Sequence, residues 1–373
     1  MITYRKYTAI LALMGAVFFL LSCAKVERKP LSYLDTPEHH TYTGISLMNQ
    51  GKYPDAEREF DLAIQLNPKF SRAYGGSGLV QAYKGDFDTA FDLMKKADKY
   101  AKEKEEKIYA HVGKIRLFTM RKKKRNWLQR AYEQFENAVK LDPKSSAAYY
   151  FMGIAYKYGL EYNNAGSAFA KVLDLNDKYL EEANNEWRLV QKIQRATPRT
   201  QAGKRIALVE SLTRADTAAL FMEELKIDKL FERRSPETFV SERKAAIDIR
   251  DHVLRNDIEG MLKIGIRGLE VYPDEAFHPD DLITRAVFAM MIEDIIIKIT
   301  GNDGLSRKFI GAVSPFPDLK NDHPSFNAVM MVTTRGIMQA RDLTTGKFSP
   351  LAAISGVDAL LIIRKLQDEL RYF

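Results

Sequence analysis

The stretch TRAVFAMMIEDII, residues 284–296, is the clearest helix signal in the C-terminal half of the chain. Two similar stretches flank it at a fixed distance: TRADTAALFMEEL begins at Thr213 and SGVDALLIIRKL begins at Ser355, each 71 residues away. Each stretch opens on a hydroxyl residue, a type preferred at the N-cap of a helix, and Asp216 and Asp358 follow three positions later, as in a capping box. A helix that recurs at one spacing predicts a duplicated structural unit.

The same offset of 71 residues relates other short motifs in the last two repeats. The pairs are Asp251-His252 with Asp322-His323, Gly265-Ile266 with Gly336-Ile337, and Phe277-His278-Pro279 with Phe348-Ser349-Pro350. Together with Ile283-Thr284-Arg285-Ala286, these motifs resemble the S-layer homology domain, in which F-x-D, a first helix, G-I, a loop with F-x-P and I-T-R-A-E follow one another. The resemblance implies three helix-loop-helix units in residues 180–373, at about 180–230, 247–300 and 314–370, in a pseudo-threefold arrangement.

The resemblance also implies a ligand. That family usually binds a cell-wall polysaccharide that carries acidic pyruvyl groups, and the arginine after the capping threonine is the usual contact to the acid. A helix N-terminus next to a guanidinium suits a carboxylate. Arg214 and Arg285 occupy this position, whereas the third unit has Gly356. The alternative is that both arginines are solvated first-turn residues of a purely structural domain. The candidate glycan-binding residues are Arg214, Arg285, Thr213, Thr284, Asp251 and Asp318.

The N-terminal half of the chain has a shorter period. Three glycines are each followed twelve residues later by an alanine, as Gly44 with Ala56, Gly78 with Ala90 and Gly153 with Ala165. Gly113 lies eighteen residues before Ala131, and we place the six extra residues in a longer basic turn around residues 121–126. The pattern resembles the tetratricopeptide repeat, whose small residues let two antiparallel helices approach closely. Four such repeats in residues 37–179 predict a curved solenoid with a concave face.

The first helix of each repeat lines the concave face in that family. The matching positions here are mostly apolar and are our candidate groove residues: Ile45, Met48, Leu79, Tyr150 and Ile154. An apolar segment or an amphipathic helix of a partner protein is therefore the guest we expect. The alternative is that these side chains pack against the downstream domain.

The N-terminus has the features of an export signal. Two basic residues precede an apolar run, residues 8–21, which is short for a membrane span of about 20 residues. The run ends in LLSC, which resembles the lipobox of bacterial lipoproteins, so we expect a signal peptide over residues 1–22, lipid on Cys23 and a tether over residues 23–36. An uncleaved anchor helix is the alternative. In Gram-negative families an aspartate after the cysteine retains the protein in the inner membrane, and Ala24 therefore indicates an outer-membrane lipoprotein that faces the periplasm.

Composition narrows the classes of function. The chain has 373 residues, a formal net charge of +8 and a single cysteine, which excludes an intramolecular disulfide. Basic proteins often bind nucleic acid, but an exported protein meets anionic wall polymer and lipid head groups instead. The six histidines show no metal-ligand spacing, and no catalytic constellation stands out. We therefore predict no enzymatic activity, no cofactor, no metal and no nucleic acid; a wall-glycan hydrolase would need a carboxylate pair that the sequence gives no basis for choosing.

These features together predict an all-α protein with a lipid anchor, four tetratricopeptide-like repeats and three S-layer-homology-like units. The first functional hypothesis is a non-enzymatic envelope scaffold. It binds cell-wall polysaccharide or peptidoglycan through the C-terminal units and a protein partner through the solenoid. The second is an assembly factor of a secretion or outer-membrane complex, whose C-terminal units dock protein rather than glycan. Gly356, which stands where an arginine is expected, favours the second hypothesis.

Overall fold

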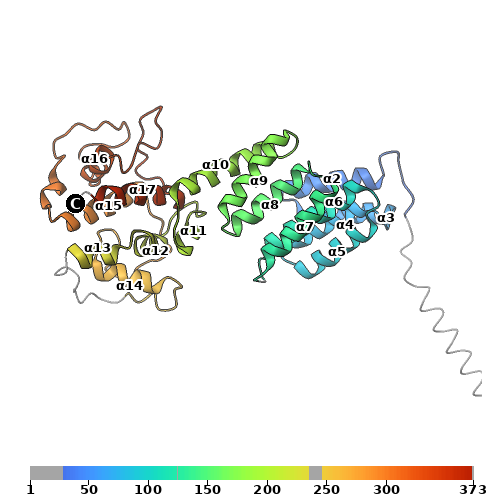
Figure 1. The fold of residues 1–373 in the computed structure, drawn as a ribbon, viewed down its shortest axis with the longest axis horizontal. Helices are drawn as coiled ribbons and strands as arrows, with labels where there is room; N and C mark the ends of the chain where they lie inside the picture. Colours follow the sequence, from blue (N-terminus) through green and yellow to red (C-terminus); the bar gives the residue numbers. More distant parts are fainter. Residues whose placement is uncertain (1–27, 124, 235–245, 372–373) are drawn as a thin grey trace, which may run out of the picture. The chain divides into compact units, whose positions relative to one another are not determined.

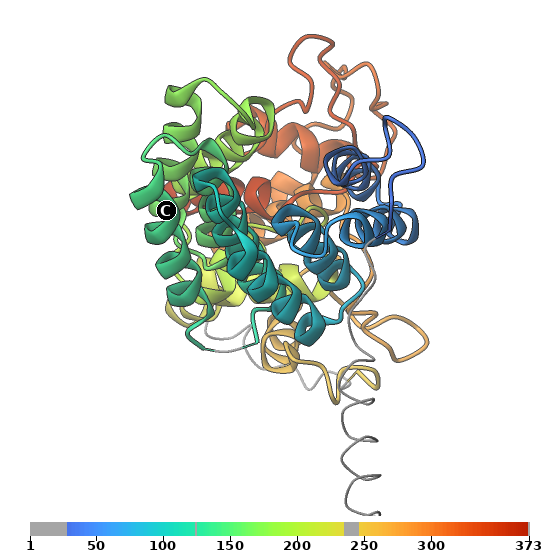
Figure 2. The ribbon, with the colours of Figure 1, turned by 90° about the vertical axis from the view of Figure 1, so that its right-hand side faces the viewer.

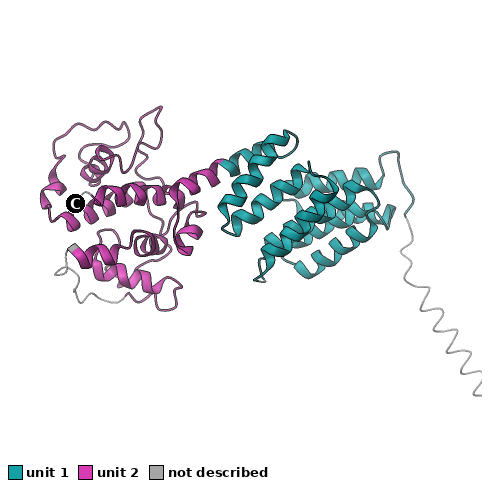
Figure 3. Ribbon diagram, in the orientation of Figure 1, with its two compact units in different colours: residues 1–187 teal, residues 188–373 magenta. Residues whose placement is uncertain are grey.

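The computed structural model describes residues 28–123, 125–234 and 246–371 (Figure 1). These residues form sixteen α-helices and no β-strand, so the predicted all-α fold is confirmed. None of the helices in these ranges is long and apolar enough to cross a membrane. The apolar run and Cys23 lie outside the described residues. The chain divides into two compact units, unit 1 (residues 1–187) and unit 2 (residues 188–373), and each is described by itself (Figure 3).

Unit 1 is a row of helical hairpins. Its helices are α2 (Pro37–Asn49), α3 (Tyr53–Leu66), α4 (Ser71–Tyr83), α5 (Phe87–Tyr100), α6 (Lys104–Arg121), α7 (Trp127–Leu141), α8 (Ser146–Tyr158) and α9 (Tyr162–Leu175), and the boundary with unit 2 falls within α10 (Leu180–Ala196). The two helices of each hairpin pack on one another, and the first helices α2, α4, α6 and α8 contact each other in chain order (Figures 1 and 2). This is the stacked arrangement of a solenoid.

Small residues let the two helices of each hairpin approach closely. The repeated alanines are fully buried, namely Ala56, Ala90, Ala131 and Ala165. A Cβ atom added to Gly44 would lie 2.8 Å from the ring of Phe60, and one added to Gly153 would lie 2.6 Å from the ring of Phe169. Because real Cβ atoms keep a larger distance, the glycines are needed for this packing. The glycine-to-alanine spacing therefore marks the contact between the two helices of a hairpin.

The third hairpin differs from the others in length. Helix α6 has 18 residues, whereas α2, α4 and α8 have 13 each. Residues 122–126 separate α6 from α7, while only three residues, such as 84–86, separate the helices of the other hairpins. The insertion therefore lengthens the first helix as well as the turn, which corrects the prediction that the turn around residues 121–126 holds all the extra residues.

Unit 2 contains a shorter set of helices joined by long loops. Beyond the C-terminal part of α10 they are α11 (Gln201–Ile206), α12 (Arg214–Leu220) with a π-helical turn (Phe221–Leu225), α13 (Ile227–Arg234), α14 (Arg255–Ile264), α15 (Arg285–Thr300) with a 3₁₀ turn (Asp303–Arg307), α16 (Phe326–Thr334) and α17 (Gly356–Leu370). The three repeated stretches of the sequence form α12, α15 and α17. Their predicted N-caps are confirmed, because the hydroxyl oxygens of Thr213, Thr284 and Ser355 each accept a hydrogen bond from the backbone N–H three residues later.

The residues just before these three caps form a closed ring of backbone hydrogen bonds. The N–H of Leu212 donates to the carbonyl oxygen of Ile354 at 2.9 Å. Ile354 donates to Ile283 at 3.2 Å, and Ile283 donates to Leu212 at 2.8 Å, which closes the ring. All three side chains are buried. Because the three residues are 71 positions apart and their bonds return to the starting residue, the three repeats have the pseudo-threefold arrangement that the sequence predicts.

Candidate functional site

At the first junction of the ring, an arginine from one repeat holds the loop of the next. Arg214, the first residue of α12, donates through Nε to the carbonyl oxygen of Phe277 at 2.7 Å. Its Nη1 and Nη2 donate to the carbonyl oxygens of Gly268 at 2.6 Å and Glu270 at 2.7 Å. The guanidinium also lies over the rings of Tyr272 and Phe277 at 4.6 and 4.5 Å. Arg214 is only 4% exposed, and all three of its side-chain nitrogens donate hydrogen bonds to groups within unit 2.

Arg285 repeats this arrangement at the second junction, with one difference. Its Nε donates to the carbonyl oxygen of Phe348 at 2.8 Å, and its Nη2 donates to that of Gln339 at 2.6 Å. Its Nη1 donates to no group among the described residues. Burial lowers the pKa of both arginines, but a guanidinium stays charged at neutral pH. Arg214 and Arg285 are 4% and 8% exposed, so the alternative that they are solvated first-turn residues is wrong.

The third junction explains why Gly356 stands in place of an arginine. A Cβ atom on Gly356 would lie 1.7 Å from the carbonyl oxygen of Ile206. The 71-residue offset aligns Ile206 with Phe277 and Phe348, whose carbonyl oxygens accept the Nε bonds at the other junctions. Here that carbonyl oxygen lies directly against the start of α17, and the N–H of Gly356 donates to Val209 at 2.8 Å. The glycine is therefore a packing requirement of ring closure.

The candidate aspartates differ in position and role. Asp318 accepts hydrogen bonds from the N–H groups of residues 348–349, at 2.9 and 2.8 Å, and so fixes the F-x-P loop. In the second repeat the same role belongs to Asp248, which accepts from residues 277–278 at 2.8 and 2.7 Å. Asp251, the other candidate aspartate of the second repeat, is exposed and has no hydrogen bond or ion pair within the described ranges. The distance to the F-x-P motif identifies the aspartate that fixes the loop, because Asp248 and Asp318 precede the motif by 29 and 30 residues.

A basic pocket of about 510 Å³ lies beside Arg285 in unit 2. Its charged lining consists of Lys192, Arg285, Arg341, Lys365, Glu210 and Asp358. Lys192 forms an ion pair with Asp358 at 2.7 Å. The side chains of Arg341 and Lys365 are exposed and form no ion pair among the residues that the structure describes. Two cations thus remain available at the pocket, which Arg285 also lines, and this is the chemistry that an acidic ligand needs.

The junction at Arg214 lacks this basic lining. The 71-residue offset relates Arg341 to Glu270 and Lys365 to Asp294, so two acidic residues stand where the pocket has its available cations. All three side-chain nitrogens of Arg214 also donate to groups of the fold, whereas only two of those of Arg285 do. The structure therefore brings together only part of the predicted glycan site, and the Arg285 junction is the one with the charge for an anion.

The candidate groove residues of the solenoid separate into two groups. Met48 and Leu79 are 4% and 1% exposed, so their side chains belong to the packed core rather than to a binding face. The other three are half-buried: Ile45, Tyr150 and Ile154. Tyr150 stacks on Tyr179 with ring centroids 4.8 Å apart, and burial raises its pKa to about 12. The face that these residues share is partly used by packing within unit 1.

Comparisons with known proteins agree with both halves of the fold. Residues 43–104 match the tetratricopeptide repeat family, and residues 315–359 match the S-layer homology domain. The chain carries tetratricopeptide repeats and an S-layer homology domain. It is also similar to "Tetratricopeptide repeat protein 6" of Homo sapiens, with 30% identity over 130 residues, which cover 35% of this chain and 24% of that protein.

The two matched families bear on the kind of function. Tetratricopeptide repeats are protein-interaction modules, S-layer homology domains bind the cell wall, and neither family is catalytic. Within residues 28–123, 125–234 and 246–371, no group of three or more His, Cys, Asp or Glu residues could hold a metal ion. The matches support the role of a scaffold or adaptor associated with the cell envelope.

Proposed function

We propose that this protein is a non-enzymatic scaffold of the bacterial cell envelope. In this proposal unit 2 binds an acidic cell-wall polysaccharide, the solenoid binds a protein partner, and lipid on Cys23 holds the chain at the outer membrane, facing the periplasm. The observation that carries the proposal is the basic pocket beside Arg285, in a unit that matches a family of wall-binding domains.

The pocket supplies cations from two separate elements. Lys365 belongs to α17, and Arg341 follows the end of α16. An acidic group of the glycan would pair with these two side chains, and the Nη1 group of Arg285 would donate a further charge-assisted hydrogen bond. Each such contact is weak in water. The polymer presents many acidic groups and lipid holds the protein at the membrane, so the effective concentration of acidic groups at the pocket is high.

Sedimentation with purified sacculi tests this proposal. The mature chain should sediment with sacculi at low salt, and Arg341→Glu with Lys365→Glu should weaken binding at least tenfold because the pocket then repels an acid. Arg307→Glu with Lys320→Glu is the matched control, since both side chains are exposed, lie in unit 2 and do not line the pocket. Equal binding by the two double variants, or no sedimentation of the wild-type chain, would remove the wall-binding claim.

The second candidate function is an assembly factor whose C-terminal units dock a protein of a secretion or outer-membrane complex. It is favoured by the first and third junctions, since all three side-chain nitrogens of Arg214 donate to the fold and residue 356 is a glycine. Crosslinking in cells, followed by mass spectrometry, separates the two candidates. Crosslinks from unit 2 to one dominant protein support the assembly factor, and crosslinks mainly to glycan support the wall-binding scaffold.

The lipid anchor has its own test. Cys23→Ser should move the protein from the membrane fraction to the soluble periplasmic fraction and abolish its labelling by a radioactive fatty acid. Several acyl chains together give stable anchoring, so their loss should be complete rather than partial. A Cys23→Ser variant that remains in the membrane fraction would support an uncleaved anchor helix instead.

A further inference from the structure

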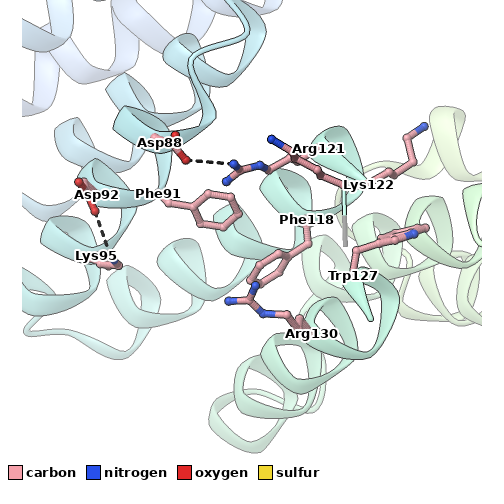
Figure 4. Close-up of a pocket in the computed structure, with 10 residues that line it drawn as sticks. Asp88, Phe91, Asp92, Lys95, Phe118, Arg121, Lys122, Trp127 and Arg130 are labelled. Atoms are coloured by element: carbon pink, nitrogen blue, oxygen red, sulfur yellow. Dashed lines mark hydrogen bonds and ion pairs between the residues drawn. The ribbon is translucent and has the colours of Figure 1, made fainter. Parts of the chain in front are cut away.

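A separate pocket lies in unit 1, at the hairpin with the insertion. It has a volume of about 380 Å³ and is bounded by α5, the end of α6 and the start of α7 (Figure 4). The candidate groove residues of the solenoid belong to α2, α4 and α8, so this pocket is a different surface. The longer link between α6 and α7, residues 122–126, contributes Lys122 and Lys123 to its lining.

Aromatic rings form the apolar part of this pocket. The rings of Phe91 and Phe118 are 5.0 Å apart between centroids, and Trp127 is half-buried beside them. Figure 4 shows the two phenylalanine rings between Arg121 and Arg130. The guanidinium of Arg130 lies over the ring of Phe118 at 4.5 Å, and that of Arg121 lies over the ring of Phe91 at 5.8 Å. The pocket therefore offers an apolar floor with cations at its edge.

The charges around the pocket do not cancel. The charged lining consists of Lys95, Arg121, Lys122, Lys123, Arg130, Asp88 and Asp92. Arg121 pairs with Asp88 at 3.0 Å, and Lys95 pairs with Asp92 at 2.9 Å. The other three cations have no carboxylate partner among the described residues: Lys122, Lys123 and Arg130. The excess is positive, so charge complementarity selects an acidic partner.

A second hollow, also of about 380 Å³, adjoins this pocket. The two share Asp88, Arg121 and Lys123, and the second is further lined by Gly85, Asp86 and Phe87. With Asp86 included, the two hollows together still have more cations than carboxylates. Since they share three lining residues, the two hollows form one continuous surface, which we call the α5–α7 track. A surface of two adjoining hollows can hold several residues of an extended chain.

We propose that the α5–α7 track binds an acidic segment of a partner protein in which a large apolar side chain lies between carboxylates. The apolar side chain packs on the rings of Phe91, Phe118 and Trp127, and the flanking carboxylates pair with the cations that have no carboxylate partner among the described residues. This inference rests on the proposed function, because it assigns a surface and a sequence chemistry to the protein partner of the solenoid. It places that partner on α5, the end of α6, the inserted turn and the start of α7, where none of the candidate groove residues lies.

A lipid phosphate fits the track less well. A phosphate site brings several donors together around one point, often at a helix N-terminus. Here the cations come from α5, the end of α6, the inserted turn and α7, and the floor consists of aromatic rings, which supply apolar contact area rather than donors. The extended acidic peptide uses both features.

A fluorescence titration of the mature chain with synthetic peptides tests the inference. Trp187→Phe leaves Trp127 as the sole reporter in the chain, because the sequence has two tryptophans. The probe is a ten-residue peptide with one phenylalanine between two pairs of aspartate and glutamate. Its binding should shift the emission of Trp127 and weaken as salt rises. Peptides with serine for phenylalanine, or with lysine for the acidic residues, should bind at least tenfold more weakly. No binding of the acidic peptide, or equal binding of all three, would overturn the inference.

Charge reversal on the protein gives the matching control. Lys122→Glu with Lys123→Glu should weaken binding of the acidic peptide at least tenfold. Lys140→Glu with Lys144→Glu, which reverses two exposed lysines of the same unit outside the track, should leave it unchanged. An equal loss of peptide affinity in the two double variants would mean that only the net charge of the protein matters, and it would contradict the assignment of the track.

A crosslinking experiment in cells separates this inference from the proposed function. A photoreactive residue at the exposed position Gln129, one residue before Arg130, should capture the partner, and Lys122→Glu with Lys123→Glu should abolish the capture. A partner that is still captured from the concave face, at Ile45 or Ile154, but not at Gln129 would overturn the track and keep the protein-binding function. Capture from neither face would contradict the protein-binding function itself.

Discussion

Unit 1 and unit 2 are both made of repeated helix pairs, but unit 1 is a linear stack and unit 2 is a ring. In the stack each hairpin contacts its neighbours through small residues such as Gly44 and Ala56. In the ring three backbone hydrogen bonds through Leu212, Ile283 and Ile354 lead back to their start. A stack is stabilised by the sum of neighbouring contacts, so the loss of one contact is local. In the ring every repeat contacts both of the others, so the loss of one junction disturbs the arrangement of all three.

The two arrangements also present different kinds of surface. Unit 2 brings Lys192, Arg341 and Lys365 from distant parts of the sequence to one pocket, which also contains Arg285 and Ile354 of the ring. The stack tolerates an insertion in one hairpin, and the inserted turn opens a new hollow without disturbing the repeat before or after it. Changes in the ring should therefore act on stability first, and changes on the surface of the stack should act on binding alone.

The largest loss of stability is expected from a substitution at the third junction of the ring. Gly356→Ala places a methyl group 1.7 Å from the backbone oxygen of Ile206. The backbone at Ile206 can move away from this methyl group only if the ring opens. We expect a loss of about 4 kcal/mol or more in the stability of unit 2. Thermal unfolding followed by circular dichroism, with limited proteolysis to identify the unit that opens, measures it. Gly304→Ala, which meets only the Oδ1 atom of Asn302 at 3.1 Å, is the control, and equal melting of the two variants would contradict ring closure.

The next largest effect is expected at the first junction. Arg214→Met keeps much of the apolar stem but leaves three carbonyl oxygens without a donor, and we expect a loss of about 3 kcal/mol. Arg214→Lys should be intermediate, because an ammonium cannot reach three acceptors in a fixed fork. The urea midpoint of unit 2 checks this order. Arg341→Met removes an exposed arginine of the same unit and should change stability by less than about 0.5 kcal/mol. A similar loss in Arg214→Met and Arg341→Met would argue against the junction role.

The repeat spacing predicted the helices and the threefold relation correctly, since hydroxyl N-caps and the G-I and F-x-P motifs are local signals. It could not predict the direction of the arginine side chains. Arg214 and Arg285 follow a helix cap, where a side chain can point to solvent or to a neighbour, and only ring closure decides between the two. For the same reason Gly356 looked like a lost binding residue, although it is set by the approach of Ile206, 150 positions earlier in the chain.

In the solenoid, too, the sequence predicted local contacts but not contacts between separate hairpins. The glycine-to-alanine spacing predicted which residues meet within a hairpin, because both lie in one local motif. It assigned Met48 and Leu79 to the concave face, but whether an apolar side chain on a first helix is buried depends on the hairpins that pack beside it. The basic turn was visible as a run of charge. Its pocket was not, since the aromatic floor comes from Phe91 on the preceding hairpin as well as from Phe118.

A smaller effect is expected from a glycine of the stack. Gly44→Ala brings a methyl group to 2.8 Å from the ring of Phe60, a side chain that can shift slightly, unlike the backbone at Ile206. We expect a net loss of about 1 kcal/mol, because overpacking is partly offset by the better helix propensity of alanine. The thermal midpoint of unit 1 measures it. In a Phe60→Leu background the same substitution should cost less, and an unchanged cost would show that the ring is not the obstacle.

The smallest effect on stability is expected at His40, where residues 28–35 join the stack, and it depends on pH. Burial lowers the pKa of His40, but its hydrogen bonds to Glu59 at 2.6 Å and Asp35 at 2.9 Å outweigh burial, so the pKa is raised above 6.5. The folded chain therefore holds this proton more tightly than the unfolded chain. The resulting stabilisation is full below about pH 6.5 and is lost as the pH rises through the folded pKa.

Glu59→Gln checks this sign. Because the amide carries no charge, it should lower the pKa of His40, which a nuclear magnetic resonance titration of the imidazole reports directly. The variant should melt about 1–3 °C below the wild-type chain at pH 5.5, and the difference should shrink towards pH 8.5, because less of His40 is then protonated. A difference that is equal at both pH values would mean that Glu59 acts through packing rather than through the charge of His40, and the junction of this segment with the stack would then be indifferent to pH.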